Sequence, residues 1–141
     1  MFTDAEIAYL LAQRLGRMAT IQPGGSLQVS PVCYTFDPET GSFDVAGIDM
    51  APSQKFRNVS DNGRVAFVVD DLASIDPWRV RCVEIRGHAE AINASASPGD
   101  RRDGSLIRIH PEQIISFGIG VDCDPHELAV HNRRIGDSSC A

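Results

Sequence analysis

A basic and polar cluster occupies the stretch SQKFRNV, residues 53–59, where Lys55, Arg57 and Asn58 fall within four positions. A lysine ammonium and an arginine guanidinium can together hold an anion, the lysine as a point charge and the arginine as a planar fork of donors. A short basic helix on an acidic protein can equally be a face that only water contacts. The stretch therefore leaves two interpretations open, an anion site and a solvated surface.

The charge of the whole chain limits which anions such a cluster could serve. The sequence has 141 residues and a formal net charge of −6, whereas a protein that neutralises many phosphates needs a basic face. We therefore expect no nucleic-acid partner, and any anion must be bound locally. A chain of this length is enough for one domain with a buried core.

Metal ligands are a second candidate for chemistry. The sequence HELAVH, residues 126–131, resembles a zinc-protease helix, but its histidines are five positions apart and would point to different faces of a helix. Asp122, Cys123 and Asp124 could add ligands, yet a histidine in a polar tail is more often a solvated side chain, so we expect no metal. The four cysteines have irregular spacing and no C-x-x-C pair, which predicts free thiols: Cys33, Cys82, Cys123 and Cys140.

Motifs for nucleophilic catalysis and nucleotide binding are absent from the sequence, which has no G-x-S-x-G, no P-loop and no G-x-G-x-x-G. We therefore expect the chemistry to belong to a bound cofactor that the fold orients. No run of about 18 apolar residues could span a membrane. The acidic start MFTDAEIAYLL is unlike a signal peptide, so the chain is predicted to be cytoplasmic, with no membrane partner.

The elements that must position these residues are mainly strands. Thr3 and Glu6 form a capping-box pattern before apolar residues at helical spacing, so we expect a helix over 4–14, and a second, short helix over 53–60. Strands are expected over 15–22, 27–36, 42–48, 64–70 and 81–93, with one or two more over 105–120, and the first three form a meander. Without a crossover helix of sufficient length, this pattern favours a mainly β fold with few helices, a closed or split β-barrel.

The domain is expected to span residues 1–121. After Gly120 the sequence is polar and has no apolar periodicity, so residues 122–141 are expected to form a mobile C-terminal tail.

The order of several motifs resembles a known family. These motifs are RLGRMAT, DPETG, KFRNV, RVAFVVDD, DPWR and VEIRGHAE, and they look like the pyridoxamine-phosphate-oxidase-like (PPOX) class of split barrels over residues 2 to about 120. More narrowly, the sequence is similar to the branch that uses the deazaflavin coenzyme F420. Within that branch the likeness is to a group that includes a tetracycline-pathway reductase, which implies a bulky polyketide or similar substrate.

The resemblance implies an FMN-binding-like split β-barrel with an N-terminal helix and a short phosphate-loop helix. It also implies a homodimer with two shared cofactor clefts, in which Val65, Phe67, Val83 and Ile85 lie between barrel core and dimer interface. Ser53, Lys55 and Arg57, together with helix N–H groups, would hold the cofactor phosphate. Arg57, Arg79 and Arg81 would be partners for the polyglutamyl tail of F420, although Arg81 can equally be an exposed surface arginine. The candidate cofactor-binding residues are Ser30, Pro31, Val32 and Cys33 at the ring, Gly47 and Met50 at its linker, Ser53, Lys55, Arg57 and Asn58 near the phosphate, and Trp78 and Arg79.

Two of these candidates have alternative interpretations. Pro31 within a strand indicates either an edge or a place where the backbone turns to a ligand. Trp78 could line the substrate side of the cleft from the partner chain, or it could be a packing anchor in a loop.

Two departures from the oxidases argue against vitamin B6 oxidation. Gln54 stands where those enzymes usually have an arginine beside the lysine, and their basic and histidine residues near the C-terminus are not recognisable here. The leading expectation is an F420-dependent oxidoreductase that transfers a hydride to a conjugated small-molecule acceptor, with no catalytic residue assigned. The alternatives are an FMN-binding split-barrel oxidoreductase and a non-catalytic F420-binding protein.

Overall fold

The chain forms a mainly antiparallel β structure with two helices. The computed structural model describes residues 1–94, 99, 102–120 and 129–136. The elements follow in the order α1 (Asp4–Ala12), β1 (Leu15–Ile21), β2 (Leu27–Cys33), β3 (Thr35–Phe36), β4 (Phe43–Ala46), α2 (Gln54–Asn62), β5 (Arg64–Ser74), β6 (Arg79–Ile92), β7 (Leu106–Phe117) and β8 (His131–Arg134).

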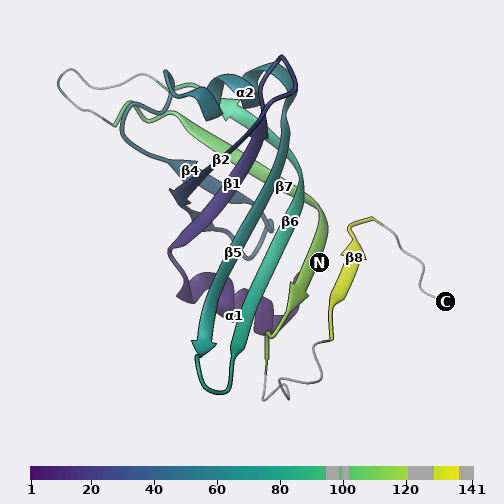
Figure 1. Cartoon of the computed structure of the whole chain (residues 1–141). Coiled ribbons are helices and arrows are strands. Elements are labelled where there is room, and N and C mark those ends of the chain that lie inside the picture. Colours follow the sequence, from purple (N-terminus) through teal and green to yellow (C-terminus); the bar gives the residue numbers. More distant parts are fainter. Residues whose placement is uncertain (95–98, 100–101, 121–128, 137–141) are drawn as a thin grey trace.

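One curved sheet holds all the strands, in the order β2-β1-β5-β6-β7-β4-β3, with β8 on the second half of β7. The sheet curls into a split β-barrel, with α1 at one end and α2 at the other (Figure 1). A β-bulge at Glu112 of β7, opposite Arg86 and Gly87 of β6, helps to bend the sheet. A Cβ on Gly87 would lie 2.2 Å from the carbonyl oxygen of His110, so only glycine fits there. The predicted fold class is confirmed.

The predicted three-strand meander is wrong in its last pairing. The β1–β2 hairpin forms as expected, but β4 pairs with β7 instead of β2. The chain leaves β2 at Tyr34, whose ring packs against Phe43 and Phe67 and whose hydroxyl donates to the carbonyl oxygen of Leu10 at 2.6 Å. The Tyr34 ring therefore packs against the core directly after the end of β2.

Both helices carry the local signals that their sequences predict. Thr3 caps α1 by accepting a hydrogen bond from the N–H of Glu6, and the Glu6 carboxylate accepts one from the N–H of Thr3 in return. Helix α2 begins after Ser53 and ends at Gly63, which has a φ of 68°. Gly63 also accepts a hydrogen bond from the N–H of Ala89, which fixes the end of α2 against β6.

The core lies inside the barrel and is rich in β-branched and aromatic side chains, including Phe43, Phe67 and Ile109. Val65, Phe67, Val83 and Ile85 are already buried within the single chain. These residues belong to the inner face of the sheet, so a second protein chain could only meet the opposite face.

Part of the expected mobile tail is a strand. His131–Arg134 form β8, and the guanidinium of Arg133 binds both carboxylate oxygens of Glu6 in α1. Glu6 also accepts a hydrogen bond from the hydroxyl of Ser116 at 2.8 Å. The contact between Glu6 and Arg133 is invisible to periodicity because it joins positions 127 residues apart. Asp122, Cys123, Asp124, His126 and Cys140 lie outside the described residues.

Cys33 and Cys82 are free thiols, as predicted for them. No helix among the described residues is long and apolar enough to cross a membrane.

Candidate functional site

The N-terminal end of α2 brings the predicted linker and phosphate residues together. The Ser53 hydroxyl donates to the carbonyl oxygen of Met50 at 2.6 Å and accepts from the N–H of Phe56 at 3.3 Å. The Met50 side chain is buried, and its methyl carbon would lie 3.7 Å from a Cβ built on Gly47. Gly47, Met50 and Ser53 therefore form one compact turn that delivers the chain into α2.

Lys55 and Arg57 are the cations of this turn and helix. Lys55 is half-buried and is the only lysine in the sequence; its ammonium makes no hydrogen bond or ion pair with any residue that the structure describes. Arg57 is exposed and donates to the amide oxygen of Gln54 at 3.0 Å. With no carboxylate beside them among the described residues, both cations are available to an anion from outside.

The side chain of Asn58 is already hydrogen-bonded within the protein and has a structural role. Its side chain is fully buried. Its amide nitrogen donates to Thr20 at 3.0 Å and to Gln28 at 3.1 Å, and its oxygen accepts from Gln54 at 2.7 Å. A cofactor contact would have to replace one of these bonds, so in this structure Asn58 joins α2 to β1 and β2.

The four predicted ring residues on β2 divide between two faces. Ser30 pairs with the core residue Met18, and Val32 is buried, so the side chains of Ser30 and Val32 point into the barrel. Pro31 pairs with exposed Arg17, so Pro31 and Cys33 point outward. Strand alternation therefore prevents all four side chains from bordering one ring. Strand β2 is an edge strand, which accounts for the tolerance of Pro31.

Ser30 carries an unsatisfied hydroxyl. Its oxygen is buried and has no hydrogen-bond partner among the described residues. Leaving a buried hydroxyl unpaired costs about 1–3 kcal/mol. A polar group that approached the edge of β2 could supply the missing bond.

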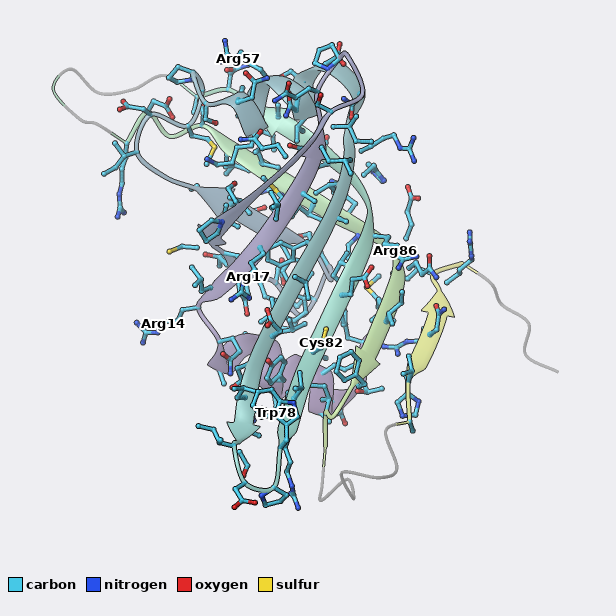
Figure 2. All side chains as sticks on the ribbon, in the orientation of Figure 1. Arg14, Arg17, Arg57, Trp78, Cys82 and Arg86 are labelled. Carbon is cyan, nitrogen blue, oxygen red and sulfur yellow. The ribbon has the colours of Figure 1, made fainter. Side chains whose placement is uncertain are left out.

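Trp78 and Arg79 lie far from the other predicted residues. They are at the turn between β5 and β6, at the end of the barrel opposite α2, as the positions of Trp78 and Arg57 in Figure 2 show. Trp78 is 60% exposed, so it does not anchor the core of its own chain. The single chain therefore does not bring Trp78 and Arg79 to the cations of α2.

Arg81 does not have the free guanidinium that a polyglutamyl tail would need. It forms a two-point ion pair with Asp71, at 2.8 and 2.5 Å, and lies 5.0 Å above the ring of Tyr9. The hydrogen bonds from Arg81 oppose the effect of burial and keep the pKa of Asp71 below its usual value. This pair joins β5 to β6, and the hydroxyl of Tyr9 in α1 donates to the same Asp71 carboxylate at 3.0 Å.

Sequence reasoning missed Gln28 near this site, and it noted Gln54 only as a departure from the oxidases, without its hydrogen bonds. Gln54 bridges Arg57 and Asn58, and Gln28 reaches Asn58 from β2. The spacing from 54 to 58 is a helical i,i+4 pair and could have been noticed. The contact from Gln28 had no local signal. The described residues contain no group of three or more histidine, cysteine or acidic side chains that could hold a metal ion.

Comparisons with known proteins give the family. The family model for pyridoxamine 5′-phosphate oxidase matches residues 2–116. A 5a,11a-dehydrotetracycline/5a,11a-dehydrooxytetracycline reductase of Streptomyces rimosus is 44% identical over 137 residues, covering 95% of this chain and 93% of the reductase.

Two solved structures share the fold. A pyridoxamine 5′-phosphate oxidase-related, FMN binding protein of Nostoc punctiforme has a TM-score of 0.60 at 13% identity, over 93% of this chain and 96% of its own. A FAD-binding protein of Mesorhizobium loti has a TM-score of 0.61 at 20% identity, over 82% and 93%. With the fold, the motif order and the matched range in agreement, the chain belongs to the pyridoxamine 5′-phosphate oxidase family.

Proposed function

We propose that the protein is an F420-dependent oxidoreductase. When bound, the reduced deazaflavin would supply a hydride to a conjugated small-molecule acceptor, and solvent or a nearby polar group would supply the proton. The similarity to a reductase at 44% identity over nearly the whole chain supports the reaction class. The name of that relative makes a dehydrotetracycline the first acceptor to test.

The main observation behind the proposal is that the two cations of α2, Lys55 and Arg57, have no anionic partner among the described residues. Lys55 has no partner among the described residues, and Arg57 has only an uncharged one. Both lie in the first turns of a helix whose N-terminal N–H groups favour an anion. A cofactor phosphate would give both cations a partner.

Gln54 favours the deazaflavin over FMN. Its amide oxygen accepts from Arg57 and its amide nitrogen donates to Asn58, so both ends of the side chain are used within α2. The site therefore has no second cation directly beside Lys55. A tight clamp on a terminal FMN phosphate would need one.

The residues of the chain would bind the cofactor and orient its ring. Lys55 and Arg57 would hold the phosphate, the outward side chains of Pro31 and Cys33 would border the ring, and the hydroxyl of Ser30 would meet a polar group at the strand edge. Packing on this surface would exclude water from the reacting carbon.

We further propose a homodimer with shared clefts. The outward face of β1 and β2 exposes an apolar row in which Leu27 is 79% and Val29 is 68% exposed. Exposed apolar patches of this kind mark interfaces. Trp78 and Arg79, at the far end of their own barrel, could reach a cofactor at α2 only from a second copy (Figure 2).

Sedimentation at micromolar protein is expected to report twice the chain mass of 15.3 kDa. Val29→Glu should place a charge in the interface and weaken self-association at least about tenfold, because an unpaired buried charge costs several kcal/mol. Leu11→Glu, on the exposed side of α1, is the matched control and should remain dimeric. A wild-type monomer that still binds F420 would refute the shared clefts.

The cofactor proposal is tested by titrating the purified protein with F420 and with FMN side by side. We expect F420 to bind at least about tenfold more tightly, a difference of 1.4 kcal/mol. Reduced F420 should then be oxidised when a dehydrotetracycline acceptor is added. Tighter FMN binding would favour the flavin alternative. F420 binding without turnover across a panel of conjugated acceptors would favour the non-catalytic alternative.

A further inference from the structure

A hydrogen bond from a distant part of the chain holds the turn before α2. The carboxylate of Asp103, between β6 and β7, accepts a hydrogen bond from the backbone N–H of Ala51 at 3.0 Å, across 52 positions of the sequence. Strand β6 ends and β7 begins near the α2 end of the barrel (Figure 1). Ala51 lies between Met50 and Ser53, so the bond acts on the backbone that leads into α2 and to Lys55.

Asp103 is itself fixed near the ends of two paired strands. Its other carboxylate oxygen accepts a hydrogen bond from the N–H of Ser105 at 2.9 Å. Ser105 is buried, and its hydroxyl accepts from the N–H of Ala94 at 3.3 Å. Next to them, Ile92 of β6 pairs with Leu106 of β7. Asp103 therefore connects the turn before α2 to the sheet.

The turn contains a backbone conformation that needs support. Asp49 has a φ of 51°, in the left-handed region that residues other than glycine rarely adopt. Such a conformation persists only where the surrounding structure holds it. Met50 follows with a side chain that is 3% exposed, and the N–H of Ala51 comes next, bound to Asp103. Contacts within the protein therefore set the shape of the turn.

The carboxylate of Asp103 is ionised at neutral pH. Hydrogen bonds from the N–H groups of Ala51 and Ser105 hold the pKa of Asp103 below its usual value. An ionised acceptor makes a stronger hydrogen bond than a neutral one. Because each carboxylate oxygen accepts from a backbone N–H, Asp103 acts on the cations of α2 through the turn.

We propose that Asp103 is a positioning residue for the phosphate site at the start of α2. Through the N–H of Ala51, it holds the turn in the shape in which one phosphate can meet Ser53, Lys55 and Arg57. This role rests on the proposed function, because the phosphate is that of the proposed cofactor. Asp103 is not among the candidate cofactor-binding residues and needs no contact with the cofactor.

Asp103→Ala is expected to weaken F420 binding about three- to tenfold, because apparent affinity falls with the fraction of molecules that keep the binding shape. Asp103→Asn keeps one acceptor oxygen, so its affinity should lie between those of the wild type and Asp103→Ala. The measurement is a titration of each protein with F420. Without cofactor, the N–H of Ala51 should also exchange faster with solvent in Asp103→Ala than in the wild type.

Asp37→Ala is the matched control. The Asp37 carboxylate accepts from the N–H of Glu39 at 2.9 Å, as Asp103 does from Ser105, but in the turn between β3 and β4. Asp37→Ala should bind F420 as the wild type does. Thermal unfolding should show that every variant is folded at the temperature of the titration, which separates lost binding from lost folding.

The same replacement in a Lys55→Ala background separates positioning from a general loosening of the fold. Asp103→Ala should cost less affinity there, because a contact that it supports is already gone. An equal loss in both backgrounds, unchanged F420 affinity in Asp103→Ala, or tighter binding by Asp103→Asn would overturn this role and leave the proposed function intact. A wild-type protein that binds neither F420 nor FMN would overturn both. If FMN is the ligand, the same titrations with FMN decide the role of Asp103.

Discussion

Replacing Lys55 by alanine is expected to weaken F420 binding by about ten- to a hundredfold. The reason is that a hydrogen bond to a charged group contributes about 1.5–3 kcal/mol, and the ammonium of Lys55 has no competing partner among the described residues. The measurement is a titration of the variant and the wild type with F420 at low salt, followed by the same titration at raised ionic strength. Salt should weaken the wild type more than the variant, since it screens the charge that the variant lacks.

Two companion variants sharpen this test. Lys55→Met keeps the apolar stem and loses the charge, so it should bind as weakly as Lys55→Ala. Arg14→Ala removes an exposed cation elsewhere and should bind F420 as the wild type does.

Chemical modification of Lys55 gives a separate test. Because Lys55 is the only lysine in the sequence, a lysine acylating reagent should modify only this side chain and the N-terminus, and bound F420 should protect Lys55. Unchanged F420 affinity in Lys55→Ala would place the phosphate elsewhere.

Arg133→Ala is expected to destabilise the protein by about 3 kcal/mol at neutral pH. Removing one partner of a buried ion pair leaves the other charge without compensation, and the side chain of Glu6 is only 3% exposed. The guanidinium of Arg133 is 31% exposed, so we expect the lower end of the usual range. The measurement is chemical unfolding at equilibrium, with the thermal midpoint falling by about 10 °C.

Arg134→Gln is the matched control, because it removes the neighbouring charge of the same strand from an exposed side chain. Its stability should stay within about 0.5 kcal/mol of the wild type. In a Glu6→Gln background, Arg133→Ala should cost much less, because the buried charge is already gone. An Arg133→Ala variant as stable as the wild type would mean that β8 is not held by this pair in solution.

The pH dependence gives an independent check on the same pair. Burial alone would raise the pKa of Glu6, but hydrogen bonds from Arg133, Ser116 and the backbone of Thr3 outweigh it and lower the pKa. A lowered folded-state pKa means that the stabilisation is fully present above the unfolded value, about 4.3, and is lost as the pH falls through the folded value. The stability difference between wild type and Arg133→Ala should therefore be full at neutral pH and shrink under acid.

The local structure of this protein could be predicted from short-range patterns. The capping box at Thr3 and Glu6, the helix start at Ser53 and the alternation of β5 and β6 all appear as expected. Each depends on neighbours within a few positions, where backbone geometry and side-chain spacing are fixed by the chain itself. The order of motifs was also sufficient to indicate the family.

The candidate site was only partly predictable. The sequence placed Lys55 and Arg57 on a short helix, and the structure does so as well, with Ser53 as the N-cap of that helix. It did not reveal that Asn58 is buried or that Ser30 and Val32 face the core, because these positions depend on which strand lies beneath the helix and which face of β2 is covered.

The partners of β4 and β8 were decided only by the tertiary structure. Strand β4 pairs with β7, which lies far from it in the sequence. Strand β8 also pairs with β7, and this pairing places Arg133 beside Glu6. The same folding brings the carboxylate of Asp103 to the backbone N–H of Ala51. A local pattern determines which element a segment forms, because that depends on its own backbone. The neighbour of each element depends on how the whole chain best buries its apolar surface, and no short stretch contains that information.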